Sequence, residues 1–246
     1  MPEIDDAANR KIKAVIFDMD NTLFDFVSAK QHACREVARF LDRDDGESLF
    51  GYFLHGKHGF ESHENIRDYL IDRKMFGEET LARSIAIYER EKLRVLIPYP
   101  LIHEVLGEIR RKALRMAVLT DAHNGNALLR LKKLDLDQYF DCVITTDMTG
   151  CKKPAPEPFM LALKMLGTRP EETLVIGDSI RRDIAPGKHL GMITAHAAYG
   201  DRNVPAPDPS VADVVLHSVR DIADFITRIC DTDESWISAE KKYCRK

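Results

Sequence analysis

Short apolar segments recur along this chain, and longer amphipathic stretches separate them. Residues 13–17 (KAVIF) contain four apolar positions in a row, which suits a strand buried on both faces. Similar strands are predicted at residues 115–120, 142–146, 173–177, 192–197 and 213–216. Helical patterns lie between most of them, at residues 101–112, 124–134 and 157–166. This alternation predicts an α/β protein with a doubly wound, mostly parallel sheet covered by helices on both faces.

One long region interrupts this alternation. Amphipathic helices are predicted at residues 28–41, 64–75 and 78–95, and residues 51–59 (GYFLHGKHG) are expected to form a glycine-punctuated loop. The pattern predicts a smaller helical domain, residues 25–98, inserted into a discontinuous α/β core made of residues 1–24 and 99–230. Residues 231–246 are expected to form a separate polar C-terminal tail.

Composition narrows the class of protein. The 246 residues carry a formal net charge of −4, which argues against a dedicated nucleic-acid binder. No apolar run approaches the roughly 20 residues that span a bilayer, and the polar N-terminus is unlike a signal peptide. The five cysteines are scattered, which disfavours a disulfide scaffold or a zinc site. These features predict a cytoplasmic protein.

Acidic residues gather where two of the predicted strands end. Asp18 and Asp20 follow residues 13–17, whereas Asp178 and Asp183 follow residues 173–177. Ligands of open α/β sheets bind outside the carboxyl ends of the strands, so these side chains are expected to meet. Carboxylates brought together repel one another unless a cation neutralises them, and oxygen ligands favour Mg²⁺ at a site that also holds phosphate.

Two further side chains follow other predicted strands. Thr120 ends residues 115–120, and Lys153 lies in the loop after residues 142–146. A hydroxyl and an ammonium group would complete a phosphate-binding site. Taken singly, an aspartate of this kind is usually a turn former or a helix cap, and such a lysine is usually a solvated surface residue. The joint pattern favours a functional site.

Four segments resemble the motifs of the haloacid dehalogenase-like hydrolases and occur in that family's order. They are FDMDNTL (17–23), VLTDA (118–122), KKPAPEPF (152–159) and VIGDSIRRDI (175–184). The resemblance covers about residues 11–218. It implies a Rossmann-like core, identifies the helical insertion with the family's cap domain after the first motif, and indicates the phosphatase branch.

The resemblance also assigns roles to residues. It implies that Asp18 is the nucleophile and forms an aspartyl-phosphate, and that Asp20 is the general acid and then the general base. Thr120 and Lys153 would bind the transferring phosphoryl oxygens. The implied Mg²⁺ ligands are a carboxylate oxygen of Asp18, the backbone carbonyl of Asp20, and Asp178. Asp183 would be an outer ligand or a partner of Lys153, and backbone N–H groups near Met19 and Asp121 are candidate phosphate donors.

The resulting prediction is a Mg²⁺-dependent phosphoric monoester hydrolase that acts on a small phosphorylated metabolite. Asn21 stands where many members of the family have glycine, and Asp121 occupies a position often held by asparagine. A phosphosugar mutase of the same fold stays open, because it too retains both aspartates of the first motif. A haloacid dehalogenase is disfavoured by Asp20, since such enzymes typically lack the second aspartate.

Two readings from other classes fit less well. A signalling receiver would carry its phosphorylated aspartate on a later strand, and it would leave the helical insertion unexplained. An inactive binding module would be expected to lack a key carboxylate, and none is missing. Substrate selectivity is expected to lie in the helical insertion, where the candidate contacts are His55, Lys57, His58 and His63.

Overall fold

The computed structural model describes residues 12–202 and 211–231, and the chain divides into two compact units. Unit 1 comprises Met1–Leu23 and Tyr99–Lys246, and unit 2 comprises Phe24–Pro98. The tail predicted at residues 231–246 lies, apart from its first residue, outside the described residues. No helix in the described part combines the length and the apolar character that crossing a bilayer requires.

Unit 1 is built on a six-stranded sheet in which every neighbouring pair is parallel, in the order β3-β2-β1-β4-β5-β6. The strands are β1 (Ala14–Phe17), β2 (Arg115–Leu119), β3 (Cys142–Ile144), β4 (Thr173–Gly177), β5 (Ile193–Ala197) and β6 (Val214–Leu216). The prediction of a doubly wound parallel sheet is confirmed. Strands β1 and β4 are buried along their whole length, which explains why they appear in the sequence as unbroken apolar runs.

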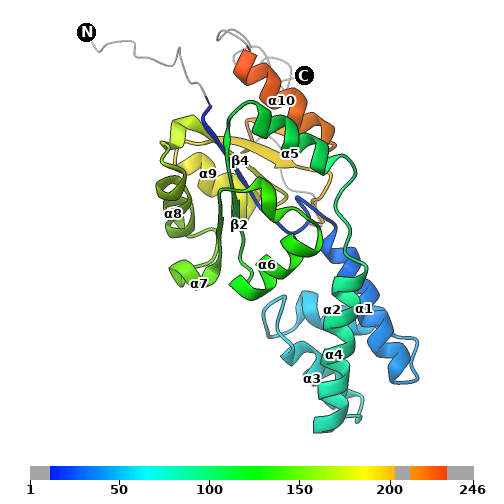
Figure 1. Ribbon diagram of the computed structural model, residues 1–246. Coiled ribbons are helices and arrows are strands. Elements are labelled where there is room, and N and C mark those ends of the chain that lie inside the picture. The colour runs from blue at the N-terminus through cyan, green and yellow to red at the C-terminus, as the bar shows by residue number, and fades with distance from the viewer. Residues whose placement is uncertain (1–11, 203–210, 232–246) are drawn as a thin grey trace, which may run out of the picture. The chain divides into compact units, whose positions relative to one another are not determined.

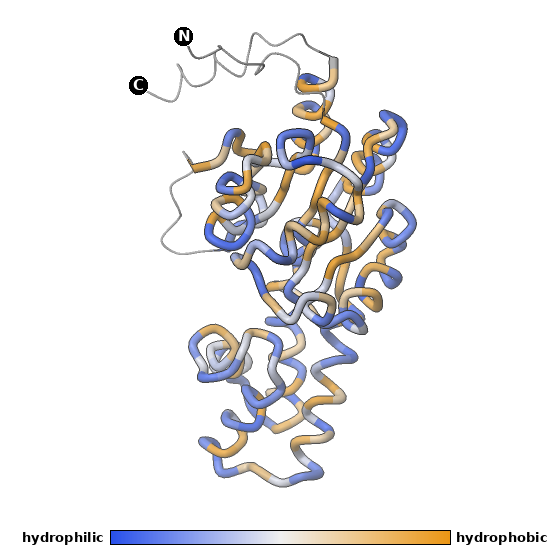
Figure 2. Tube along the Cα trace, turned by 90° about the vertical axis from the view of Figure 1, so that its left-hand side faces the viewer, coloured by the Kyte–Doolittle hydropathy of each residue, from blue (hydrophilic) through white to orange (hydrophobic). Residues whose placement is uncertain are grey.

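Helices cover both faces of this sheet. Figure 1 shows α5, α6 and α10 on one face and α8 and α9 on the other, the arrangement that right-handed crossovers produce when the strand order reverses. The helices of unit 1 are α5 (Ile102–Arg111), α6 (Asn124–Lys133), α7 (Thr146–Thr149), α8 (Pro156–Leu166), α9 (Ala185–His189) and α10 (Arg220–Asp231). Apolar positions concentrate on the strands between the two helical layers (Figure 2).

Helix α8 illustrates how the sequence builds one layer. Pro156 occupies its first turn, where a missing N–H costs nothing, and Gly167 ends it in the left-handed conformation at φ +62°. Its buried face packs Phe159 and Leu163 against Ala117 and Ile144 of the sheet. The helix therefore anchors the loop that precedes it, which carries Lys153.

The strand order fixes where a ligand can bind. Strands added after β1 extend the sheet first to one side, through β2 and β3, and then to the other side, through β4, β5 and β6. The order reverses between β1 and β4, and open α/β sheets bind ligands outside the carboxyl ends of the strands at such a point. Asp18 follows β1 and Asp178 follows β4, so both lie at the reversal.

Unit 2 contains four helices, α1 (Phe26–Phe40), α2 (Gly46–His55), α3 (Glu64–Asp72) and α4 (Glu78–Arg94). The prediction of a loop at residues 51–59 is wrong for its first half, because α2 continues through Gly51 to His55. Leu49, Phe50 and Phe53 have helical spacing and are buried in the core of unit 2, and this burial outweighs the weak helix propensity of the glycine.

The chain passes between the units through two adjacent segments. Phe24 forms an antiparallel bridge with Pro98 in unit 2. In unit 1, the Tyr99 N–H donates to the Leu23 carbonyl over 3.0 Å. Helix α1 then begins at an ordinary cap, since a carboxylate oxygen of Asp25 accepts the Ser28 N–H over 2.9 Å.

Candidate active site

Three aspartates meet at the reversal of the strand order. Asp18, Asp178 and Asp183 each offer a carboxylate oxygen, and these oxygens lie within 4.8 Å of one another. All three residues are buried. The Asp18 N–H donates to the Ile176 carbonyl over 2.8 Å, which is the last hydrogen bond between β1 and β4. Asp18 therefore lies where the chain leaves the sheet. Such a cluster fits a divalent cation, which removes the mutual repulsion of the carboxylates.

Lys153 lies within this cluster. Its Nζ is 2.5 Å from Asp18 Oδ1 and 2.6 Å from Asp183 Oδ1, and it also donates to the Leu119 carbonyl over 3.0 Å. The side chain is 1% exposed. Burial alone would lower the pKa of Lys153, but the charges of Asp18 and Asp183 outweigh burial and raise the pKa above its ordinary value. The ammonium therefore stays charged and holds two of the three acids.

Asp183 is brought back to the sheet by a π-helical turn, Ile180–Ile184. Its Oδ2 accepts the Ser179 N–H over 3.1 Å. Gly177, the last residue of β4, makes this approach possible, because a Cβ at that position would lie 2.5 Å from the Asp183 side chain. Burial, followed by the neighbouring Asp18, raises the pKa of Asp178, and burial is also the main cause of the raised pKa of Asp183.

The turn after Asp18 is held in an uncommon backbone conformation. Asn21 has φ +63°, in the left-handed region that glycine and asparagine adopt most easily. The Thr22 hydroxyl donates to Asp18 Oδ2 over 3.1 Å and accepts the Asp178 N–H over 3.1 Å. Thr22 thus links the two strand ends. Its carbonyl accepts the Tyr199 hydroxyl over 2.8 Å.

Asp20 is not a member of the three-aspartate cluster found among the described residues. Both of its carboxylate oxygens are contacted by Nη1 of Arg130, at 3.0 and 3.2 Å. The sequence analysis did not identify Arg130, which lies on α6 and is 3% exposed. A signal was present, because Ala127, Arg130 and Leu131 have the i, i+3, i+4 spacing of one helix face and the other two are buried. A charged residue on an apolar face indicates a buried partner.

The remaining predicted residues lie around the cluster. Thr120 is buried directly after β2, and its Oγ1 accepts the Ala122 N–H over 3.1 Å. Asp121 Oδ1 accepts the backbone N–H of Lys153 over 2.9 Å, which fixes the lysine loop. The Met19 side chain is fully buried, and its carbonyl accepts the Leu23 N–H over 2.9 Å. Asp121 therefore has a structural bond to the lysine loop besides any contact with a ligand.

A second arginine lies beside the cluster. Arg182 Nη1 is 3.6 Å from Asp121 Oδ2, and Nη2 is 3.8 Å from Asp178 Oδ1. Both distances exceed a hydrogen bond, and the Arg182 side chain is 37% exposed. Its burial would lower the pKa of the guanidinium, but the surrounding aspartates raise it. Arg182 thus adds positive charge at the rim of the site.

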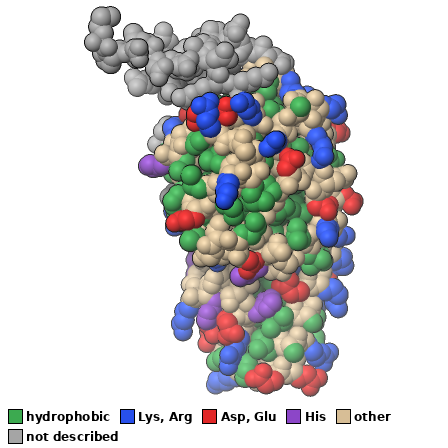
Figure 3. Space-filling model, turned by 60° about the vertical axis from the view of Figure 1, so that its left-hand side comes forward, with side chains coloured by type: hydrophobic (Ala, Val, Ile, Leu, Met, Phe, Trp, Pro, Cys, Tyr) green, Lys and Arg blue, Asp and Glu red, His purple; other side chains and the backbone are tan. Residues whose placement is uncertain are grey.

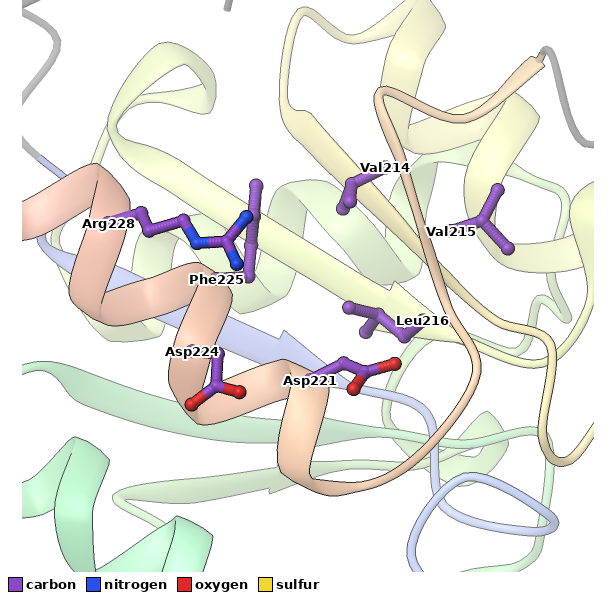
Figure 4. A pocket seen from close by; sticks show the side chains of 7 residues that line it. All are labelled: Val214, Val215, Leu216, Asp221, Asp224, Phe225 and Arg228. Atoms are coloured by element: carbon purple, nitrogen blue, oxygen red, sulfur yellow. The ribbon is translucent and has the colours of Figure 1, made fainter. Parts of the chain in front are cut away.

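A separate hollow of about 160 Å³ lies between β6 and α10 (Figure 4). It is lined by Val214, Val215, Leu216, Asp221, Asp224, Phe225 and Arg228. None of the predicted site residues lines it. The carboxylate cluster, and not this hollow, is therefore the candidate active site.

Comparisons with known proteins agree with the geometry. A family model described as haloacid dehalogenase-like hydrolase matches residues 12–191. A glyceraldehyde 3-phosphate phosphatase of Methanocaldococcus jannaschii is 27% identical over 228 residues, covering 89% of this chain and 98% of the relative. The pyrophosphatase PpaX of Bacillus mycoides is 26% identical over 224 residues, covering 89% of this chain and 99% of the relative.

A solved structure is similar over nearly its whole length. The crystal structure of a HAD phosphatase from Thermococcus onnurineus superimposes with a TM-score of 0.63 at 26% identity, covering 87% of this chain and 98% of the other. The predicted family resemblance and the prediction of a hydrolase are confirmed. The names of the relatives agree with the phosphatase branch.

Proposed function

The chain belongs to the haloacid dehalogenase-like hydrolase family, and we propose that it hydrolyses the phosphate ester of a small metabolite with Asp18 as nucleophile. One observation carries the proposal. Asp18 lies at the reversal of the strand order, bound to Lys153 at 2.5 Å and grouped with Asp178 and Asp183 within 4.8 Å. A carboxylate there can attack a phosphorus atom whose oxygens are neutralised from the surrounding side chains.

The first step forms an aspartyl-phosphate. A carboxylate oxygen of Asp18 forms a bond to phosphorus while the bond from phosphorus to the leaving oxygen breaks. Lys153 and Thr120 bind the transferring phosphoryl oxygens, and the ammonium is available because its raised pKa keeps it charged. The Thr22 hydroxyl orients Asp18 through Oδ2, which holds the nucleophile in one rotamer.

Asp20 moves the protons. It gives a proton to the leaving oxygen in the first step and takes one from the attacking water in the second, when the bond from phosphorus to Asp18 breaks. Its side chain is 21% exposed, so a leaving group and a water molecule can reach it. General acid–base catalysis of this kind contributes roughly 10²–10⁴ in rate.

The charge balance supports a divalent cation. Asp18, Asp178 and Asp183 offer carboxylate oxygens within 4.8 Å of one another, and Lys153 is hydrogen-bonded to two of these three residues. Burial and mutual repulsion raise the pKa of Asp178 and Asp183, a penalty that a bound cation would relieve. Asp178 Oδ1 is buried and lacks a hydrogen-bond partner among the described residues, as expected of an atom that binds a metal.

These donors fit Mg²⁺, which prefers carboxylate and carbonyl oxygens. Asp18, Asp178 and the backbone carbonyl of Asp20 would hold it, with Asp183 behind them. When bound, the ion neutralises negative charge on the phosphate. The protein's own contribution is to keep these oxygens together, through Lys153 and through the Thr22 hydroxyl that links the ends of β1 and β4.

Unit 2 is the candidate source of substrate selectivity, acting as the cap domain. Among the four polar residues named from the sequence, His58 Nε2 is 3.2 Å from Asp68 and His63 Nε2 is 2.8 Å from Glu89. Two of the four thus have carboxylate partners within unit 2, which leaves His55 and Lys57, both exposed, as the better candidates for substrate contact. The names of the relatives make triose phosphates and inorganic pyrophosphate the first substrates to test.

The proposed partners are restricted to such metabolites. On the face drawn in Figure 3, Lys and Arg side chains are interspersed with Asp and Glu, unlike the continuous basic surface of a nucleic-acid binder. The described cysteines Cys34, Cys142 and Cys151 are free thiols, which suits the cytoplasm. A phosphosugar mutase remains the alternative, since the same residues serve phosphoryl transfer.

The test is phosphate release by the full-length protein. Wild type and Asp18→Asn are assayed with Mg²⁺ on a panel of sugar phosphates, triose phosphates, phosphoglycolate, nucleotides and pyrophosphate. We expect wild type to release free phosphate, Asp18→Asn to fall to background, and rapid quenching to trap phosphate on Asp18. Isomerised sugar phosphate without free phosphate would instead identify a mutase. Normal turnover by Asp18→Asn would refute the proposal.

A further inference from the structure

A buried arginine from a different part of unit 1 contacts Asp20. Arg130 lies on α6, 110 residues along the chain from Asp20, and its Nη1 reaches Oδ2 at 3.0 Å and Oδ1 at 3.2 Å. The arginine side chain is 3% exposed, whereas that of Asp20 is 21% exposed. The helix that follows β2 thus brings a cation to the loop that follows β1.

The burial of this guanidinium needs an explanation. Removing such a cation from water costs several kcal/mol, and only a well-placed anion offsets that cost. A leucine or methionine would fill this position of α6 without the cost, because Ala127 and Leu131 on the same face are packed in the core. The Asp20 carboxylate supplies such an anion to Arg130.

The two buried cations divide the acids of the site between them. Lys153 binds Asp18 and Asp183, and Arg130 binds Asp20. Asp20 is accordingly absent from the group of carboxylates that lie within 4.8 Å of one another. This division separates the carboxylate that would attack phosphorus from the carboxylate that would carry the proton.

We propose that Arg130 is a positioning residue that holds the Asp20 carboxylate for proton transfer to the leaving group and from water. The inference rests on the proposed function. One nitrogen of Arg130 contacts both oxygens, and a carboxylate has about four lone-pair positions, so the guanidinium can hold the group while one oxygen exchanges a proton. When one oxygen carries the proton, the other still accepts from Arg130, so the guanidinium keeps the group in place through both steps.

This role predicts a dependence on the leaving group. An alkyl phosphate needs a proton on its leaving oxygen as the bond breaks, whereas an aryl phosphate such as 4-nitrophenyl phosphate hardly needs one. Misplacing a reacting group by about 1 Å costs about 10²-fold in rate. Loss of Arg130 should therefore lower kcat/KM about 10²-fold with an alkyl phosphate and far less with the aryl phosphate. A loss of packing would lower both alike.

The experiment compares kcat/KM on these two substrates for Arg130→Met, Arg130→Lys, Asp20→Asn and the double variant Asp20→Asn/Arg130→Met. Lys133→Met removes an exposed cation from the same helix, and Leu131→Val loosens its buried face. We expect the alkyl-selective loss in Arg130→Met, partial rescue by lysine, and no further loss when Arg130→Met is added to Asp20→Asn, because both act through one carboxylate. In both control variants, Lys133→Met and Leu131→Val, any change in kcat/KM should be the same for the two substrates.

Equal losses on the two substrates, unchanged activity of Arg130→Met, or additive losses in the double variant would overturn the inference. If Arg130→Met does not fold, Arg130→Lys decides the matter. An alkyl-selective loss in that variant supports the inference, and an equal loss refutes it. Failure of the proposed function is distinguishable, since wild type would then release no phosphate from any substrate or Asp18→Asn would stay active.

Discussion

Replacing Lys153 by methionine should destabilise the metal-free protein strongly. Its ammonium is 1% exposed and lies 2.5 Å from Asp18 and 2.6 Å from Asp183. Without it, those carboxylates and Asp178 remain within 4.8 Å of one another. At an effective dielectric constant of about 20, two charges at that separation repel by about 3.5 kcal/mol. Removing one partner of a buried ion pair typically lowers the free energy of unfolding by about 3–5 kcal/mol.

Calorimetry in chelator measures this effect. A loss of about 3–5 kcal/mol corresponds to a fall in Tm of roughly 6–20 °C for a chain of this length. The matched control is Lys152→Met, which removes an exposed cation one residue away and should stay within about 0.5 kcal/mol of wild type. The double variant Lys153→Met/Asp183→Asn removes one of the repelling charges and should recover part of the loss. A Lys153→Met protein within about 1 kcal/mol of wild type would refute the electrostatic argument.

Three further predictions concern the same site. Burial raises the pKa of Asp178 in the folded protein, so the metal-free fold is most stable when this carboxyl group is protonated. That contribution to stability is fully present below the ordinary pKa of aspartate, and it is lost as the pH rises through the raised pKa. At one fixed concentration of Mg²⁺, the stabilisation of the fold by the ion should therefore be larger at pH 7.5 than at pH 5, because the ionised carboxylate binds the ion with a lower Kd. The stabilisation is about 2.7 kcal/mol where the concentration is 100 times Kd, and an equal rise in Tm at the two pH values would contradict this. A Cβ on Gly200 would lie 1.7 Å from the Asn21 carbonyl, so Gly200→Ala should lower both kcat and Tm, whereas Gly125→Ala, with open space around it, should not. Because Asn21 has φ +63°, the Asn21→Gly variant should fold normally, whereas Asn21→Val should lower the free energy of unfolding in urea by about 1–2 kcal/mol. Equal stabilities of the two variants would contradict this argument from the backbone conformation.

Much of the fold could be predicted because its central strands, β1 and β4, are short and buried on both faces. Each appears as an apolar run that is followed by an aspartate, and parallel order follows from the helices between the strands. The error at α2 has a physical cause. Gly51 and Gly56 indicate a loop locally, but the helix through Gly51 is stabilised by burial of Phe50 and Phe53, which only the tertiary structure provides.

The candidate site was predictable to the extent that its residues follow strands. Asp18, Asp178 and Thr120 each lie within one residue of a strand end, so the order of the elements places them together without further information. Arg130 lies in the last turn of a helix, and Asp20, which it contacts, is 110 residues away. Its role depends on how α6 packs against the loop after β1, which no local pattern encodes. The sequence showed only that a charge interrupts an apolar helix face.

The sheet order also explains why a lysine, and not a shorter residue, binds Asp18. Lys153 follows β3, which is separated from β1 by β2. Neighbouring strands are about 4.8 Å apart, so β3 lies roughly 10 Å from β1, the strand that Asp18 follows. A four-carbon side chain is needed to pass the end of β2, and Nζ bonds to the Leu119 carbonyl of that strand on the way to Asp18. The meeting of Asp18 with Asp178 and Lys153 therefore depends on one property of the fold, the placement of β1 beside both β2 and β4.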